Sequence, residues 1–121
     1  MGAKVLLVDD DPDIASLLKD ELEEAGYEVK LCDVGDEVLG VLHSFKPALL
    51  VTDVMLPGID GYSLITHMAD DKQLRDLPII VMSALTTSRS MFETIPQVKA
   101  FFSKPFNTDE FLEAVKSALA K

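Results

Sequence analysis

The chain has little of several features that would suggest other kinds of protein. Its single cysteine, Cys32, excludes a disulfide within the chain. Its 11 basic residues are outnumbered by 21 acidic ones, and the formal charge of −10 argues against nucleic acid as a direct partner, because a phosphate backbone is bound by a basic surface. No apolar run reaches the length of a membrane span, and the first residues lack a signal-peptide pattern. We therefore expect a soluble cytoplasmic protein.

Length and composition fit one folded domain. A chain of 121 residues with 48% hydrophobic residues can bury a core of ordinary size, and no internal repeat is visible. We expect residues 1–121 to form one domain. The acid excess either keeps the protein soluble or places several acids at a cation site, and the count alone does not decide between these.

Five short apolar segments predict β-strands. The runs Lys4–Val8, Ala48–Thr52 and Pro78–Met82 are rich in branched residues without alternation, which is typical of strands buried on both faces. Glu28–Cys32 alternates between polar and apolar residues, as an edge strand does. Lys99–Ser103 is the fifth predicted strand.

Helical patterns separate these strands. Asp11 as cap and Pro12 as first residue mark the start of one helix, and Gly26 marks its end. Asn107, followed three residues later by Glu110, predicts a capping box at the start of the last helix. The apolar stripe predicted for the first helix consists of Ile14, Leu17, Leu18, Leu22 and Ala25. Two further helices are predicted near residues 38–45 and 62–71.

Strands that alternate with helices form a parallel sheet with right-handed crossovers. The pattern therefore predicts an α/β fold of the (βα)₅ type. Three buried strands, with the second strand at an edge, fit a doubly wound, flavodoxin-like sheet of five strands in the order 2-1-3-4-5. Such sheets bind ligands beyond the carboxyl ends of their strands, at the switch point between strands 1 and 3.

Polar residues follow the predicted strands at that edge. Asp9 and Asp10 follow the first strand, Asp53 the third, Ser83 the fourth and Lys104 the fifth. Three carboxylates in one crevice repel one another, so either some stay protonated or a cation joins them. Hard carboxylate oxygens suit Mg²⁺, which takes one or two carboxylates together with a phosphate oxygen.

A hydroxyl and an ammonium among these acids indicate a phosphoryl group rather than a metal store. Its three equatorial oxygens would meet the metal, the Ser83 hydroxyl with a backbone N–H, and the Lys104 ammonium. Phosphoryl transfer is catalysed mostly by such positioning and charge neutralisation. Asp53, at the floor of the crevice, would then be the nucleophile. A single Asp after a strand is usually a simple cap, so this interpretation depends on all of these residues converging.

The motifs at these positions resemble the signature of response-regulator receiver domains. They are Val8-Asp9-Asp10, Asp53, Pro57-Gly58, Asp60-Gly61, Ser83-Ala84 and Lys104-Pro105-Phe106. The match covers nearly the whole chain, in the family's order and spacing, and is more specific than any one of the motifs. Residues 1–121 are thereby identified as a receiver, or phospho-acceptor, domain of two-component signalling.

The resemblance implies that Asp53 accepts the phosphoryl group. It also implies that Asp10 binds Mg²⁺ directly, that Asp9 helps through a water, and that the backbone carbonyl of Met55 is a further metal ligand. A sensor histidine kinase or a histidine phosphotransfer protein would donate the group from a phosphohistidine. The chain would catalyse only its own phosphorylation and dephosphorylation and would not otherwise be an enzyme.

The resemblance further implies a conformational switch. Ser83 would be the switch hydroxyl and Lys104 the phosphate partner, with a cis peptide bond before Pro105. In the family an aromatic on the fifth strand follows the hydroxyl inward, and here it is Phe101. Phe101 has no hydroxyl, so apolar burial should favour its inward position. The output would be contact with a downstream protein through helix 4, strand 5 and helix 5.

Two family positions that tune dephosphorylation are occupied by Met55 and Leu85. Neither side chain can hold or activate a water, so we expect a long-lived aspartyl phosphate. The chain departs from the family pattern at Pro96-Gln97, where the common Gly-Ala pair is missing. Residues 85–98 contain weak helix formers, so we expect a short or irregular fourth helix there.

Three alternatives remain to be weighed. A phosphorylation-independent pseudo-receiver, acting as a protein-interaction module, would keep the fold, but the complete acid, hydroxyl and lysine set speaks against it. An aspartyl-phosphate hydrolase would carry an acid two residues after the nucleophile, where Met55 stands. A flavin-binding domain would need a phosphate loop rich in Ser, Thr and Gly after the first strand, where acids stand instead.

Other reactive side chains are expected to be structural. Cys32 is predicted to be a small buried hydrophobe. His43 and His67 are expected to face solvent, and neither falls on the carboxyl edge of the sheet, so a zinc site is not expected there. Phe102 is expected in the core, on the side of its strand opposite to Phe101.

Overall fold

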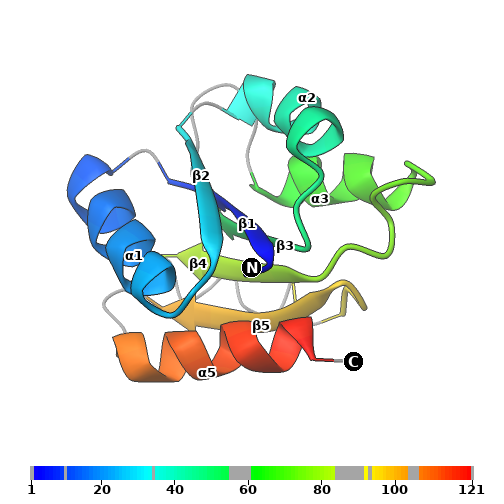
Figure 1. The fold of residues 1–121 in the computed structure, drawn as a ribbon. Coiled ribbons are helices and arrows are strands. Elements are labelled where there is room, and N and C mark those ends of the chain that lie inside the picture. The colour runs from blue at the N-terminus through cyan, green and yellow to red at the C-terminus, as the bar shows by residue number, and fades with distance from the viewer. Residues whose placement is uncertain are drawn as a thin grey trace.

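Five parallel strands form the sheet of this protein. The computed structural model describes residues 2–9, 11–33, 35–54, 61–83, 92, 94–103 and 107–120. The strands are β1 Lys4–Val8, β2 Glu28–Cys32, β3 Leu49–Asp53, β4 Ile79–Ser83 and β5 Val98–Ser103. Their order is β2-β1-β3-β4-β5, and every pairing is parallel (Figure 1). The predicted doubly wound α/β fold is therefore confirmed.

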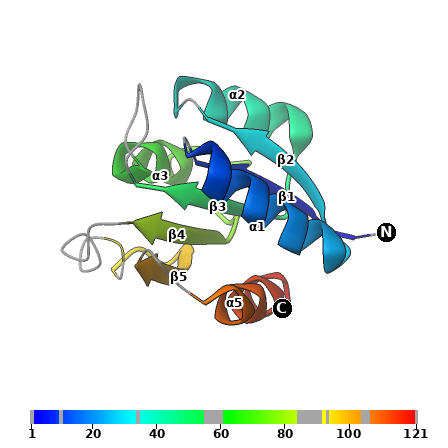
Figure 2. The ribbon, with the colours of Figure 1, turned by 90° about the vertical axis from the view of Figure 1, so that its left-hand side faces the viewer.

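Helices cover both faces of the sheet. They are α1 Pro12–Glu24, α2 Gly35–Phe45, α3 Gly61–Ala69 and α5 Thr108–Leu119. Figure 2 shows α2 and α3 above the strands and α5 below them. The helix expected between residues 85 and 98 falls mainly on residues outside the described ranges.

Side-chain caps fix the starts of the first and last helices. The Asp11 carboxylate accepts hydrogen bonds from the backbone N–H groups of Asp13 and Ile14, at 3.0 and 3.3 Å. The Asn107 carbonyl oxygen accepts from Asp109 and Glu110 in the same way, at 2.7 and 3.2 Å. Each bond satisfies a donor that has no partner within the helix. Both predicted helix starts are confirmed.

The sheet separates two apolar clusters. One lies between the sheet and α2 and α3; it includes Leu6, Val8, Leu50, Val81 and Phe92. The other lies between the sheet and α1 and α5; it includes Leu7, Leu18, Val51, Met82 and Phe111. Strands β3 and β4 are buried at every residue, as a strand covered on both faces requires.

Two residues of the predicted apolar stripe, Leu17 and Ala25, are exposed. Ala25 lies one residue past the end of α1 at Glu24. Leu17 is 52% exposed, whereas its neighbour Leu18 is 1% exposed. Successive residues of a helix are turned by about 100° around its axis. Leu18 and Leu22 lie on the face of α1 that packs against the sheet, and Leu17 lies outside that face. Ala15, which the pattern did not include, is buried in its place.

The residue before Pro47 has an uncommon backbone conformation. After α2 ends at Phe45, the N–H of Lys46 donates to the carbonyl of Leu42 at 3.1 Å, and Lys46 has a φ of 54°. Positive φ is disfavoured for residues with a Cβ, so this turn stores some strain.

Gln97 has a structural role that accounts for the departure from the family pattern at Pro96-Gln97, just before β5. Its side chain is buried, and its amide nitrogen donates to the carbonyl oxygens of Leu74 and Leu77, each at 2.8 Å. Its backbone carbonyl accepts from the N–H of Ile79 at 2.9 Å. Gln97 therefore joins the turn before β4 to the start of β5, at the amino edge of the sheet.

The expected structural residues lie as predicted. Cys32 is buried, while His43 and His67 are exposed. The Nε2 of His43 lies 2.8 Å from the Asp71 carboxylate, which links α2 to the turn after α3. Among the described residues, no helix has both the length and the apolar character to cross a membrane.

Candidate functional site

Three of the predicted site residues meet at the carboxyl edge of the sheet. The arrowheads of β3, β4 and β5 point to this edge in Figure 2. Asp9 follows β1, Asp53 ends β3 and Ser83 ends β4. Since β3 lies between β1 and β4, Asp53 stands between the other two. The register confirms this, because Val8 pairs with Thr52 and Asp53 pairs with Met82.

Buried polarity is concentrated at this edge. Within the described ranges, the buried polar or charged residues are Asp9, Thr52, Asp53, Ser83 and Gln97. All except Gln97 belong to the carboxyl edge. Asp9 and Asp53 are 3% and 6% exposed, and aspartate is almost never so buried without partners. This concentration marks the edge as the candidate site.

Asp9 is held between β1 and α1. Its N–H donates to the carbonyl of Cys32 at 3.1 Å, which extends the pairing of β1 with β2 by one residue. One of its carboxylate oxygens accepts from the N–H of Asp11 at 2.9 Å. That bond orients the carboxylate at the point where the chain turns from the strand into α1.

Asp53 is held by its neighbours on β3 and β4. The N–H of Val54 donates to the carbonyl of Met82 at 3.1 Å, so the pairing of β3 with β4 continues past Asp53. The Thr52 hydroxyl donates to the backbone carbonyl of Asp53 at 3.0 Å. Sequence reasoning treated Thr52 as an ordinary strand residue. The available signal was its hydroxyl, in a strand whose other members before Asp53 are all Leu or Val.

Four predicted residues fall outside the described ranges. They are Asp10, Met55, Leu85 and Lys104, and the cis bond expected before Pro105 falls there as well. The structure therefore brings together Asp9, Asp53 and Ser83 and leaves the others of the set as predictions.

Phe101 faces the cluster under α2 and α3. It is 8% exposed and pairs in register with Val81. Its ring lies 5.9 Å from that of Phe92, and the Phe92 ring lies 5.8 Å from that of Tyr62 at the start of α3. Phe102 points to the other face of the sheet, where the centre of its ring lies 5.9 Å from the centre of the Phe111 ring. The predicted opposite orientations of Phe101 and Phe102 are thus confirmed.

The donor set at this edge fits a hard cation. Asp9 and Asp53 supply carboxylate oxygens from adjacent strands, and oxygen is the ligand that Mg²⁺ prefers. Among the described residues, no three His, Cys, Asp or Glu side chains gather as a metal site. The third acid of the predicted set, Asp10, lies outside those residues.

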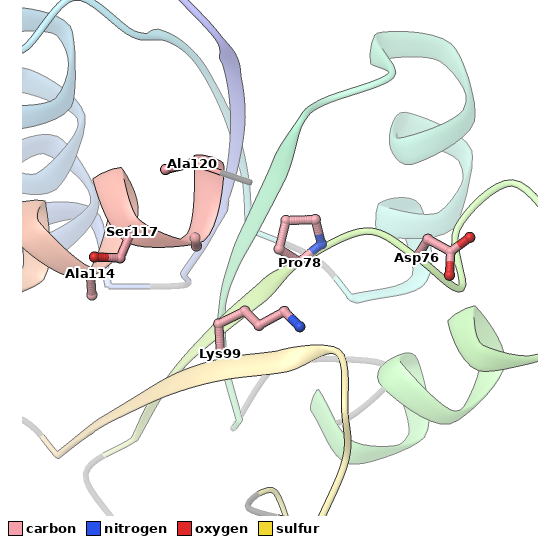
Figure 3. A pocket seen from close by; sticks show the side chains of 7 residues that line it. Asp76, Pro78, Lys99, Ala114, Ser117 and Ala120 are labelled. Carbon is pink, nitrogen blue, oxygen red and sulfur yellow. The ribbon is translucent and has the colours of Figure 1, made fainter.

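A cavity at the opposite edge has no such chemistry. It measures about 460 Å³ and lies near the amino ends of β4 and β5 (Figure 3). Its polar side chains are those of Asp76, Lys99 and Ser117, and Figure 3 shows Asp76 and Ser117 at opposite ends. The Lys99 ammonium donates to the carbonyl of Pro96 at 3.0 Å. These groups do not converge on one point, so we do not regard the cavity as a reaction site.

Comparison with known proteins agrees with the geometry. The family model described as response regulator receiver domain matches residues 5–116. The polar-differentiation response regulator DivK of Brucella ovis is 31% identical over 121 residues, which cover 98% of each chain. The DNA-binding dual master transcriptional regulator RpaA of Synechocystis is 29% identical over 119 residues. That match covers 98% of this chain, which spans about half (49%) of the length of RpaA.

A solved structure shares both the fold and part of the sequence. The response regulator TrrA of Thermotoga maritima, crystallised in complex with Mg²⁺ and BeF, superposes with a TM-score of 0.86. It is 35% identical, and the match covers 98% of this chain and 100% of TrrA. The bound Mg²⁺ is a property of TrrA.

Proposed function

The chain belongs to the response regulator receiver domain family of two-component signalling, and from that premise we propose that it accepts a phosphoryl group on Asp53 with the help of Mg²⁺. The observation that carries this proposal is the burial of two carboxylates, Asp9 and Asp53, beside the Ser83 hydroxyl at adjacent strand ends. Burial of a charge is unfavourable unless the charge is paired, and a bound cation would provide such pairing for both acids.

The reaction moves one phosphoryl group between two side chains. A carboxylate oxygen of Asp53 forms a bond to phosphorus while the bond from phosphorus to the donor's imidazole nitrogen breaks. The imidazole leaves with the electron pair of that bond. Asp53 suits this role because its backbone is fixed on both sides, by Thr52 and by the pairing of Val54 with Met82. A fixed nucleophile lowers the entropic part of the barrier.

The carboxylates would hold the metal. Asp9, Asp10 and Asp53 supply the acids, and the backbone carbonyl of Met55 supplies a neutral oxygen. Bound Mg²⁺ neutralises charge that builds up on the phosphoryl oxygens. Support comes from the oxygen-only chemistry of Asp9 and Asp53 and from the Mg²⁺ in the related TrrA structure.

Three residues would respond to the phosphoryl group: Ser83, Lys104 and Phe101. The Ser83 hydroxyl is buried one residue past the partner of Asp53 on β4, which suits a hydrogen bond to a phosphoryl oxygen. The Lys104 ammonium would neutralise a second oxygen. Phe101 on β5 would transmit the change to the output face, and its 8% exposure agrees with an inward position held by apolar contact.

The partners would be proteins. The phosphoryl donor would be a sensor histidine kinase or a histidine phosphotransfer protein, and the output a downstream protein target, in the cytoplasm. The net charge of −10 disfavours direct binding to nucleic acid.

The chain would act as a signalling module and not as a metabolic enzyme. Its only chemistry would be its own phosphorylation and dephosphorylation. The alternative, a pseudo-receiver that binds partners without phosphorylation, has no need of two buried carboxylates beside a buried hydroxyl. That burial favours the phosphorylated switch.

Acetyl phosphate tests the proposal directly. The protein is incubated with acetyl phosphate and Mg²⁺, and its intact mass is measured. We expect an increase of one phosphoryl group that requires Mg²⁺ and is lost in Asp53→Asn. An unmodified wild-type protein, or a mass increase that persists in Asp53→Asn, would contradict the proposal.

A further inference from the structure

Thr52 is a polar residue in an apolar place. It is fully buried on β3, and its register partners are Val8 on β1 and Val81 on β4. Both partners belong to the cluster under α2 and α3. Valine has nearly the same shape as threonine, and burying a hydroxyl is unfavourable unless the hydroxyl is hydrogen-bonded. Packing alone would therefore favour valine here, so the hydroxyl needs another explanation.

The Thr52 hydroxyl bonds to the residue that carries the proposed chemistry. It donates to the backbone carbonyl of Asp53 at 3.0 Å. The next backbone N–H, that of Val54, donates to the carbonyl of Met82 at 3.1 Å. These two groups belong to the same peptide unit, and a peptide unit is planar. The unit after Asp53 is thus held at its oxygen and at its nitrogen, which fixes the backbone from which the Asp53 side chain projects.

We propose that Thr52 is a positioning residue for Asp53, which acts through its hydroxyl on the backbone of the phospho-acceptor. This inference rests on the proposed role of Asp53 as acceptor. In-line attack needs the carboxylate oxygen at a defined distance and direction from phosphorus, and a misplacement of 1 Å can slow a reaction by about 100-fold. A peptide unit that rotates more freely would place the carboxylate less well.

Two substitutions separate the hydroxyl from the packing. Thr52→Val keeps the branched shape and removes the donor. Thr52→Ser keeps the donor and removes the methyl group. If Thr52 served only to fill the core, valine would be the better replacement. If it positions Asp53, serine would be.

The experiment compares rate constants of phosphorylation by acetyl phosphate at saturating Mg²⁺. We expect Thr52→Val to be about tenfold slower than the wild type and Thr52→Ser to stay within about threefold of it. Val115→Ala, a core truncation in α5 on the other face of the sheet, is the control for lost stability and should keep the wild-type rate. All variants are measured well below their unfolding temperatures.

A second readout needs neither metal nor phosphoryl group. The NMR chemical shifts of the Asp53 carbonyl carbon and the Val54 amide nitrogen report the peptide unit itself. In the absence of metal and phosphoryl group, we expect both chemical shifts to change in Thr52→Val and to stay close to the wild-type values in Thr52→Ser. If Thr52→Val does not fold, Thr52→Ala replaces it, with the same expectations.

The inference fails if Thr52→Val reacts at the wild-type rate, if Thr52→Ser is as slow as Thr52→Val, or if Val115→Ala slows the reaction equally. A wild-type protein that takes up no phosphoryl group would instead overturn the proposed function, and this inference with it. If the wild type is phosphorylated normally but the Thr52 variants do not behave as expected, only the positioning role of Thr52 is refuted.

Discussion

The two edges of the sheet bury polar side chains of different kinds. At the amino edge Gln97 is neutral, and its amide donates to the carbonyls of Leu74 and Leu77. At the carboxyl edge Asp9 and Asp53 are carboxylates on adjacent strands. A buried amide that satisfies backbone carbonyls stabilises the fold, whereas neighbouring buried carboxylates disfavour it without a cation. Burial of polar groups therefore serves stability at one edge and, in our proposal, chemistry at the other.

The largest expected effect belongs to the amino edge. Gln97→Leu would leave the carbonyls of Leu74 and Leu77 without this donor, and we expect it to lower the free energy of unfolding by about 2–4 kcal/mol. Phosphorylation of the folded protein should not change. Urea unfolding and the acetyl phosphate assay would measure the two quantities.

The matched control is Lys72→Leu, at an exposed residue of the turn that contains Leu74 and Leu77. It should change the free energy of unfolding by no more than about 0.5 kcal/mol. If Gln97→Leu slowed phosphorylation as strongly as it lowered stability, the division of roles between the two edges would be wrong.

The second prediction concerns the lifetime of the phosphoryl group at the carboxyl edge. The double variant Met55→Asn, Leu85→Glu would place polar side chains where neither Met nor Leu can hold a water. We expect the rate constant of phosphate loss to rise about tenfold, which corresponds to about 1.4 kcal/mol in the barrier. Decay of the phosphorylated mass after removal of acetyl phosphate measures it, and an unchanged or slower decay would refute the expected long lifetime.

The third prediction tests whether the carboxylates destabilise the metal-free protein. Asp53→Asn removes one of two adjacent buried charges, so we expect it to raise the free energy of unfolding without metal by about 1 kcal/mol. Added Mg²⁺ should stabilise the wild type and have little effect on Asp53→Asn. Thermal unfolding with and without Mg²⁺ would show both effects. Equal stabilisation of both proteins by Mg²⁺ would mean that the ion binds elsewhere.

The smallest effect is expected at the turn before Pro47. Lys46→Gly should relieve the positive φ of Lys46, but glycine also gains freedom in the unfolded chain. We expect a net gain of about 0.5 kcal/mol in the free energy of unfolding, with no change in phosphorylation. Urea unfolding measures the gain, and a clear loss of stability would show that the lysine side chain matters more than the backbone.

The sequence predicted the fold because its signals are local and strong. The short apolar runs of β1, β3 and β4 favour strands covered on both faces, and Asp11 and Asn107 mark helix starts by their capping chemistry. The order of strands followed from the βα alternation. Asp9, Asp53 and Ser83 could be grouped because each directly follows or ends a strand.

Other features depend on contacts that sequence spacing does not encode. Leu17 fits an apolar stripe by spacing, but the direction of α1 over the sheet leaves it exposed. Gln97 appeared only as a departure from a family pattern, because its partners at Leu74 and Leu77 are about 20 residues away. Thr52 was overlooked because threonine is common in strands, and only the position of its hydroxyl distinguishes it.

The most direct test of the central claim is an amide NMR titration with Mg²⁺ followed by beryllium fluoride. We predict shifts concentrated at Asp9, Val54 and Ser83, little change at Gln97 and Lys99, and loss of the beryllium fluoride response in Asp53→Asn. Shifts centred on the amino edge, or an undiminished response in Asp53→Asn, would contradict the assignment of the carboxyl edge as the phosphoryl site.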